Sequence, residues 1–310
     1  MTTPTSTIAT TSLTRPAAEL AADLGQSFEQ YGFAIVADHG IPADLIARAQ
    51  AQAKALFALP EEQKREWHQA GQGGARGYTP FGIEQAKGAT VRDLKEFWHV
   101  GRELPAGDPL AAFMAPNIWP DEVLPDFRPT FLELYARFEL VGARILSAIA
   151  LHLGLPEHWF DPTVDNGNSV LRLLHYPPVP PEAEGAVRAA PHEDINTITL
   201  LLGAEEAGLE LLTRSGEWLN VAPPPGALVV NIGDMLQRLT AGQLPSTTHR
   251  VVNPTGPAAA RPRYSMPFFL HFRPDFLIDP GQIDRGGANA EEPITADDYL
   301  KQRLREIKLA

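Results

Sequence analysis

The hydrophobic pattern of this 310-residue chain changes its period near residue 168, and this change constrains the fold more than any other feature. Before it, apolar residues recur every three or four positions, which is typical of amphipathic helices. After it, short apolar stretches alternate in steps of two and are separated by turn residues. Such a series of short strands is typical of a β-sandwich or barrel. We therefore predict an α+β chain in which a helical front half wraps around an all-β core.

The individual elements follow from the same pattern. Thr295 and Asp298 have the spacing of a capping box at the start of the last helix. One strand is expected in the front half, at residues 32–36, and residues 71–120 are predicted to form loops because Gly and Pro are frequent there. The expected helices cover residues 17–31, 43–59, 60–67, 126–154 and 295–309. The expected core strands cover residues 169–177, 192–202, 209–213, 218–223, 227–233, 249–253 and 263–272.

Charge and composition exclude several classes of function. The net charge is −12 and the sequence has no cluster of Lys and Arg, so neither a nucleic acid nor an anionic membrane is an expected partner. No apolar run approaches the ~18 residues that a membrane-spanning helix requires. The first residues lack the charged and apolar regions of a secretory signal, and we expect a cytoplasmic protein. Because the chain has no Cys, any metal must be held by His, carboxylate or water.

The segment RAAPHEDINTITLLLG, residues 188–203, places charged groups at the start of an apolar run, where burial of charge is costly. If residues 192–202 form one extended strand, His192 and Asp194 point to the same face and Glu193 points away from it. An imidazole and a carboxylate on one face form either an ion pair or two-thirds of a metal site. The tripeptide alone does not distinguish these two interpretations.

A third ligand candidate lies further along the chain. His249 opens the expected strand 249–253, directly after a polar loop. Two histidines and one aspartate match the facial triad of non-haem iron enzymes, which leaves metal positions open for small molecules. A structural zinc site would instead fill all four of its positions with protein ligands.

The next expected strand supports a site for a small carboxylate. Arg263 and Ser265 lie on one face of this strand, directly after the third candidate ligand. An arginine fork with a hydroxyl two residues on suits a carboxylate through charge-assisted hydrogen bonds. The alternative is an arginine that forms a salt bridge at the surface.

Several segments, taken in order, resemble a known enzyme family. The segments HEDINTITLL, NIGDMLQRLTAGQLPSTTHRV and RYSMPFF are similar to those of iron(II)/2-oxoglutarate-dependent oxygenases of the isopenicillin N synthase-like group. In the front half, GFAIVADHGIP, RGYTPFG and DLKEFW resemble the same group, and LHYPPVP matches its Tyr-Pro-Pro segment. The resemblance extends from about Phe28 to Phe272, which is most of the chain.

The resemblance implies a fold and a set of site residues. The fold would be a double-stranded β-helix, or jelly roll, with flanking helices. The three candidate ligands His192, Asp194 and His249 would bind iron(II). Arg263 and Ser265 would hold the distal carboxylate of 2-oxoglutarate, and Tyr176 would help to hold this cosubstrate.

The same resemblance implies a division of the chain and a reaction. Residues 1–120 would be the helical flanking region of the oxygenase, 121–160 the long supporting helix, 161–280 the jelly-roll core with iron and 2-oxoglutarate, and 281–310 the C-terminal helix. O₂ would convert 2-oxoglutarate to succinate and CO₂, and the oxidant formed would take hydrogen from a C–H bond of a small molecule. Hydroxylation, desaturation and ring closure all remain open. We expect a monomer.

The chain departs from the family pattern before the Tyr-Pro-Pro segment. Plant members often have Asn two residues before the tyrosine, whereas Leu174 stands there in this chain and offers no hydrogen bond. Arg172, Leu174 and Tyr176 share a face by strand alternation, so Arg172 can project toward the pocket. We predict that Arg172 binds a carboxylate, either the near one of 2-oxoglutarate or one on the substrate. The alternative is an arginine at the rim of the sheet, paired with a surface acid.

The residues that contact the substrate are predicted mainly from their position in segments that approach the pocket mouth in the family. Phe269 is expected to line the barrel itself. The Gly-rich segment ARGYTPFGIEQAKG, residues 75–88, could instead form ordinary surface turns that do not contact a substrate. The full set of candidate substrate contacts is Arg76, Tyr78, Phe81, Lys95, Trp98 and Phe269.

Four other functions remain open from the sequence. An oxidase of the isopenicillin N synthase type would use no 2-oxoglutarate and could use Arg263 and Ser265 for a substrate carboxylate. A second cation in the pocket also allows an ethylene-forming-enzyme-like fragmentation of 2-oxoglutarate. A catalytically idle binding protein on the same fold is disfavoured because the ligands and the Arg/Ser pair are intact. A zinc hydrolase is disfavoured because no general base is evident.

We expect Asn231 and Asp234, in the segment NIGD, to support the metal-bearing layer.

Overall fold

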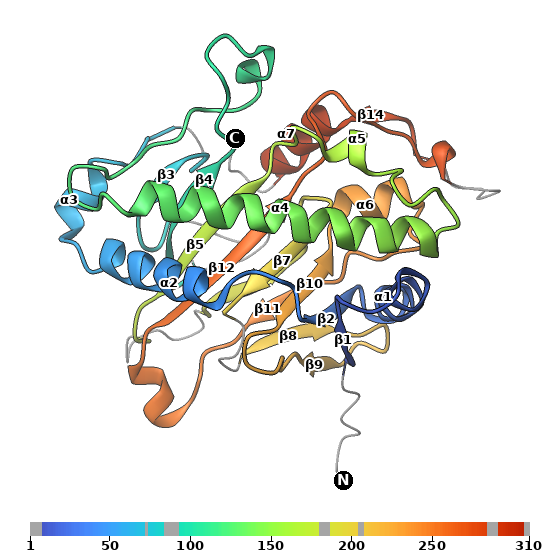
Figure 1. Cartoon of the computed structure of the whole chain (residues 1–310). Helices are drawn as coiled ribbons and strands as arrows, with labels where there is room; N and C mark the ends of the chain where they lie inside the picture. Colours follow the sequence, from blue (N-terminus) through green and yellow to red (C-terminus); the bar gives the residue numbers. More distant parts are fainter. Residues whose placement is uncertain are drawn as a thin grey trace.

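Two β-sheets enclose the centre of the molecule, and helices cover one of them from outside (Figure 1). The computed structural model describes residues 8–71, 74–83, 93–179, 187–203, 208–283 and 291–306. The larger sheet, called the major sheet, has the order β1-β2-β10-β7-β12-β5-β4-β3, and the smaller one, called the minor sheet, has the order β6-β11-β8-β9. All pairings are antiparallel except β1 with β2. This is the expected double-stranded β-helix.

The strands have the following bounds. The major sheet consists of β1 (Thr10–Ser12), β2 (Phe33–Ala37), β10 (Leu228–Ile232), β7 (Ile198–Leu202), β12 (Arg263–Leu270), β5 (Val170–Tyr176), β4 (Glu96–Gly101) and β3 (Gly77–Thr79). The minor sheet consists of β6 (Ala189–His192), β11 (His249–Val251), β8 (Leu209–Leu212) and β9 (Trp218–Asn220). A small separate pair is formed by β13 (Leu277–Ile278) and β14 (Ile294–Thr295).

A long helix covers the outer face of the major sheet. It is α4, Phe127–His152, which crosses the strands with α1 and α2 beside it (Figure 1). On β12, Phe268 faces this helix and stacks on Phe138 at a ring-centroid distance of 5.1 Å. Its neighbour Phe269 faces the inner cavity, as strand alternation requires.

The other helices are α1 (Ala17–Tyr31), α2 (Ala43–Phe57), α3 (Glu61–Arg65), α5 (Asp161–Val164), α6 (Asp234–Leu239) and α7 (Ala296–Glu306), with 3-10 turns η1 (Pro109–Ala112), η2 (Gly256–Ala260) and η3 (Pro280–Gln282).

Most expected helices are confirmed, including the start of the last one. The Thr295 hydroxyl accepts a hydrogen bond from the backbone N–H of Asp298 at 3.2 Å and donates to its carboxylate at 2.8 Å. The expected last three residues of that helix, 307–309, lie outside the described residues. No helix among the described residues is both long enough and apolar enough to cross a membrane.

The prediction of loops over residues 71–120 was wrong, because this segment contributes β3 and β4 to the major sheet. The sequence EFWHVG of β4 lacks the apolar–polar alternation that marks a half-exposed strand. All six of its residues are buried. Trp98 lies in the core under α4 and His99 lies on the opposite side of the strand, so both faces of β4 are covered and neither shows the polar pattern of an exposed face. The front half of the chain is therefore part of the same sheet and not only a helical wrap.

The prediction of one extended strand over residues 192–202 was also wrong. β6 ends at His192 and β7 begins at Ile198, and a turn separates them. The backbone of this turn binds the residues after β10: the N–H groups of Asp234 and Met235 donate to the carbonyls of Asp194 and Asn196, at 2.8 and 3.0 Å. The turn is therefore bonded to the segment after β10 as well as to a sheet neighbour, since the N–H of Thr197 donates to the carbonyl of Leu270 on β12 at 2.9 Å.

Gly142 lets α4 approach the sheet closely, and this contact gives a test of the packing. A Cβ atom at this position would lie 2.3 Å from Cδ1 of Leu270, which is buried on β12. We predict that Gly142→Ala lowers the free energy of unfolding by about 1–3 kcal/mol, as overpacked cores do. This would occur although alanine favours a helix by about 1 kcal/mol over glycine. Denaturant unfolding of Gly142→Ala, Leu270→Ala and the double variant measures it.

The double variant serves as the control. Leu270→Ala removes the obstructing methyl groups, so the loss in the double variant should be smaller than the two single losses taken together. A gain in stability from Gly142→Ala alone would contradict the close contact.

Candidate active site

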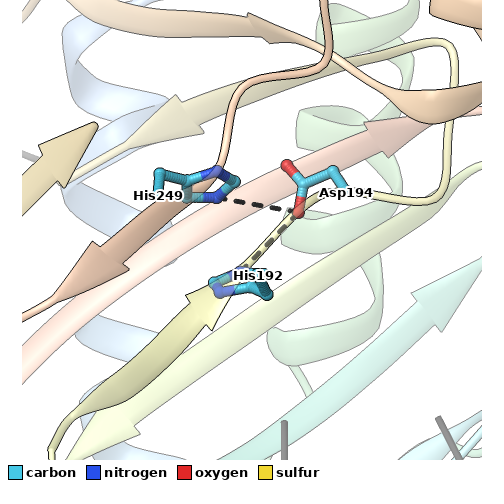
Figure 2. A group of neighbouring side chains, drawn as sticks. All are labelled: His192, Asp194 and His249. Atoms are coloured by element: carbon cyan, nitrogen blue, oxygen red, sulfur yellow. Dashed lines mark ion pairs between the residues drawn. The ribbon is translucent and has the colours of Figure 1, made fainter. Parts of the chain in front are cut away.

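Three side chains from the end of the minor sheet and the adjoining turn converge on one point (Figure 2). His192 ends β6, Asp194 lies in the turn that follows, and His249 begins the neighbouring strand β11, where it pairs with His192 across the ladder. The Asp194 carboxylate oxygen Oδ1 is 3.8 Å from Nε2 of each histidine. One ligand atom from each residue lies within 4.8 Å of the other two. Asp194 thus reaches the histidines through a turn and not through strand alternation.

The backbone fixes which nitrogen of each histidine faces the centre of the group. Nδ1 of His192 is 2.8 Å from the carbonyl of Ala190, and Nδ1 of His249 is 3.0 Å from the carbonyl of Thr247. A carbonyl only accepts, so each Nδ1 carries a proton, and Nε2 is the nitrogen of each ring that faces the centre of the group. Burial, with the nearby His249, lowers the pKa of His192 to about 4, so this imidazole is neutral at neutral pH.

Asp194 is held as an anion by its outer oxygen. Oδ2 accepts hydrogen bonds from the Thr199 hydroxyl at 2.5 Å and from the Asn231 amide at 2.8 Å. Burial alone would raise the pKa of Asp194, but the two imidazoles and these two hydrogen bonds together bring it below its usual value. The bonds leave Oδ1 free to face the histidine nitrogens, and Asn231 supports the metal-bearing layer as expected.

This set of donors suits iron(II). Two imidazole nitrogens and one carboxylate oxygen come from one side, which leaves the opposite side of a metal ion open toward a cavity. The cavity has about 570 Å³ of empty space, including its open mouth, and lies between the two sheets. Side chains from both sheets line it, among them Phe33, Leu174, Leu201, Leu209 and Val251.

A buried arginine lies in the wall of this cavity. Arg263 is only 1% exposed, and its Nε and one terminal nitrogen have no hydrogen-bond partner among the described residues. It pairs in register with Tyr176 on β5, whose ring lies 5.4 Å from the guanidinium carbon, and Ser265 follows on the same face. A buried guanidinium without a partner is costly, and a ligand carboxylate would supply the missing acceptors. This geometry fits 2-oxoglutarate.

A second arginine, Arg172, also lines the cavity on β5, as predicted together with Leu174 and Tyr176. Its Nε donates to Nε2 of His99 at 2.6 Å, and His99 Nδ1 is 2.6 Å from the carbonyl of Gly74, so the imidazole is the neutral Nδ1–H form. The guanidinium carbon lies 4.1 Å from the ring centroid of Phe97 and 5.3 Å from that of Phe269. Two rings and an imidazole therefore hold this cation in one place.

Two of the six candidate substrate contacts line the cavity. Phe269 does so beside Arg172, and Lys95 lies in the wall with its ammonium 2.8 Å from the Asp93 carboxylate. The other Asp93 oxygen accepts from the backbone N–H of Ala190, on the strand that carries His192. Asp93 therefore connects Lys95 to the metal-bearing strand.

The other four candidates lie outside the cavity lining. Trp98 is fully buried under α4, and the Tyr78 hydroxyl donates to the buried Glu96 carboxylate. The Arg76 guanidinium lies against Gly101 and donates to the carbonyl of Ala75 at 2.7 Å. Phe81 is exposed at the surface.

Sequence reasoning missed Thr199, His99 and Asp93, which orient the site residues without facing the metal. Thr199 reads as an ordinary alternating strand position, and His99 and Asp93 lie in the segment predicted to be loop. The only signal for them was that a polar side chain beside a buried charge needs a partner.

Comparison with known proteins agrees with this geometry. Residues 4–122 match the family described as non-haem dioxygenase in morphine synthesis N-terminal, and residues 167–272 match the 2OG-Fe(II) oxygenase superfamily. The chain is 35% identical over 296 residues to the 2-oxoglutarate-Fe(II) type oxidoreductase hxnY of Emericella nidulans, which covers 92% of this chain and 83% of that protein.

Solved structures extend the match to the whole fold. A 2OG-Fe(II) oxygenase family protein from Caulobacter crescentus is 53% identical, with a TM-score of 0.89, over 97% of this chain and 99% of that one. Full-length Neurospora crassa T7H in complex with alpha-KG is 30% identical, with a TM-score of 0.85, over 96% and 95% of the two chains. The fold and the triad are those of a non-haem iron enzyme. The chain belongs to the 2OG-Fe(II) oxygenase superfamily and is a 2-oxoglutarate-dependent dioxygenase with iron(II) at His192, Asp194 and His249.

The hydrogen bond from Asn231 to Asp194 gives a testable prediction. Asn231→Ala should weaken iron(II) binding by about 10- to 100-fold, as loss of an outer partner of a metal ligand does. The reason is that Asp194 Oδ2 loses one of its two donors, so the carboxylate is less well oriented and less favoured as an anion. Anaerobic competition with a chromogenic chelator measures the affinity.

Asn220→Ala, at an exposed position on β9, is the matched control and should leave the affinity within about twofold of the wild type. Equal iron affinity in the two variants would show that the Asn231 bond does not support the ligand.

Proposed function

We propose that this dioxygenase oxidises a C–H bond of a small molecule that carries a carboxylate, by hydroxylation, desaturation or ring closure, with release of succinate and CO₂. The observation that carries the proposal is that two arginines, Arg263 and Arg172, line the cavity that also contains the triad, at different heights along strand β5. Arg263 would hold 2-oxoglutarate and Arg172 would hold the substrate.

The register of the strands separates the two arginines. Arg263 lies opposite Tyr176, and Arg172 lies four residues before Tyr176 on β5, opposite His99 of β4. At roughly 3.3 Å per residue along a strand, these two levels are ~13 Å apart. A ligand held at its distal end by Arg263 and turned toward the triad therefore leaves the Arg172 level for a second molecule.

The side chains around Arg172 define what this second molecule presents. A guanidinium in a fixed orientation recognises a planar carboxylate by paired, charge-assisted hydrogen bonds. Phe97 and Phe269 flank the arginine, so apolar surface adjoins the charge. An anionic group next to an apolar body would satisfy both features.

The protein contributes position and shielding to the chemistry. Iron with 2-oxoglutarate and O₂ supplies the oxidation, in which one oxygen atom enters succinate as CO₂ leaves and the other is available to oxidise the substrate. Arg172 would set the distance between the substrate carboxylate and the bond that reacts. Phe33, Leu201 and Leu209 would keep water away from the reacting bond.

Relatives support a small substrate. Neurospora crassa T7H has been crystallised with alpha-KG and thymine, and this chain matches that structure with a TM-score of 0.85.

The first experiment measures cosubstrate binding. Apo-protein is loaded anaerobically with iron(II) and titrated with 2-oxoglutarate, and the visible charge-transfer band of the chelate is followed. Arg263→Leu should raise the dissociation constant of 2-oxoglutarate by about 10- to 100-fold, since hydrogen bonds to a charged group contribute about 1.5–3 kcal/mol. An unchanged constant would mean that Arg263 does not hold the cosubstrate, and O₂ uptake without 2-oxoglutarate would favour the oxidase.

The second experiment tests Arg172. Small carboxylic acids are screened against their neutral amides for stimulation of succinate release, in the wild type and in Arg172→Gln. We expect acids to stimulate the wild type, amides to be inactive, and Arg172→Gln to lose the stimulation while it keeps its affinity for 2-oxoglutarate. Equal stimulation by amides contradicts the proposal. Weaker 2-oxoglutarate binding in Arg172→Gln would assign this residue to the cosubstrate, and ethylene release would indicate fragmentation of 2-oxoglutarate.

A further inference from the structure

The C-terminal helix α7 forms a buried ion pair with the loop beneath the metal site. Arg303 of α7 lies 2.7 Å from the Asp234 carboxylate, which is 3% exposed, and its other terminal nitrogen lies 2.8 Å from Glu306. Asp234 is the first residue of α6 and follows β10 directly. A carboxylate buried this deeply requires a cation, and within the described part of the chain Arg303 forms an ion pair with it.

The backbone around Asp234 holds the turn that carries Asp194. The N–H of Asp234 donates to the Asp194 carbonyl at 2.8 Å, and the N–H of Gly233 donates to the Thr197 carbonyl at 3.1 Å. The two loops are in direct contact, because a Cβ atom at Gly233 would lie 2.3 Å from the carbonyl oxygen of Asn196. The backbone of Asp234 is therefore bonded directly to the backbone of Asp194.

The same short helix also holds the segment that leads to His249. The Gln237 side-chain oxygen accepts from the backbone N–H of Ser246 at 2.7 Å. Next to this contact, the Thr248 hydroxyl donates to Glu193 at 3.0 Å, which joins the two ligand-bearing segments outside the cavity. Thus α6 contacts the chain on both sides of the metal site.

α7 is fixed to α6 by a second contact besides the ion pair. The guanidinium of Arg238 on α6 lies 5.4 Å from the ring centroid of Tyr299 on α7, and it donates to the Glu292 carbonyl at 2.6 Å. A ring contact and an ion pair therefore set the position of α7 on α6.

We propose that Arg303 is a positioning residue for the iron site, which acts through Asp234 on the turn that carries Asp194. Removal of its charge leaves the Asp234 carboxylate buried without its cation, so the start of α6 must shift or take up water. The turn then holds Asp194 in a less favourable position and iron binds more weakly. This inference concerns the metal site and is independent of the substrate proposed above.

The test compares two arginines of the same helix. Arg303→Gln and Arg305→Gln remove the same charge from α7, but Arg305 is exposed. Iron(II) affinity is measured anaerobically by chelator competition, and the unfolding midpoint of each metal-free variant is measured separately. We expect about tenfold weaker iron binding in Arg303→Gln, at the low end of the effects of outer-shell residues. Arg305→Gln should match the wild type.

Asp234→Asn and the double variant complete the test. If the two residues act as one pair, Arg303→Gln should weaken iron binding much less in the Asp234→Asn background than in the wild type. We expect Asp234→Asn to bind iron more weakly than the wild type, because it removes the same ion pair. If Arg303→Gln does not fold, Arg303→Lys replaces it in the test: it keeps the charge, and its iron affinity should lie between those of the wild type and of Asp234→Asn. A lower unfolding midpoint with iron affinity equal to that of Arg305→Gln would overturn the proposal, since Arg303 would then only stabilise the fold.

Discussion

The buried charge of Asp194 is the interaction on which the rest of the site depends. A carboxylate inside a protein is costly unless it is hydrogen-bonded and lies beside a cation or a metal ion. Thr199 and Asn231 bind one oxygen, which directs the other to the two histidine nitrogens. The two histidines are in turn oriented by their own backbone, through carbonyls two residues upstream. The metal centre is therefore built mostly from local turns, and the sheets supply the frame that brings these turns together.

Strand β12 shows how one element serves both the core and the site. Phe268 packs under α4 on the outer face, whereas Arg263, Ser265 and Phe269 face the cavity. The same alternation on β5 places Arg172 and Tyr176 in the cavity wall. A shift of one residue in register would exchange the two faces, so the packing of α4 against the sheet also fixes which side chains reach the ligands.

The sequence predicts these faces well where alternation is regular, and this explains why the faces of Arg263 and Arg172 could be identified before the structure. The triad was identified from its residue types and its resemblance to the family, whereas the expected alternation between His192 and Asp194 is replaced by a turn. Prediction by alternation fails where the backbone binds something other than a neighbouring strand. The turn after His192 is bonded to the loop at Asp234, a contact that no local pattern encodes. β4 is buried on both faces and therefore shows no alternation, and so His99, the partner of Arg172, stood in a segment predicted to be loop. Most candidate substrate contacts were drawn from the same part of the chain, where position in sequence gave no orientation.

The metal ligands lie on both sides of a long stretch of chain that includes β7, β8, β9 and β10. Iron bound at His192, Asp194 and His249 would close this stretch as a loop, as a covalent cross-link would. In the unfolded chain His249 is far from His192 and Asp194, so the complete set of ligands exists only in the native state and the metal binds that state almost exclusively. Its binding free energy then becomes folding free energy, and the resistance of the protein to heat and to proteolysis should rise with the concentration of free iron.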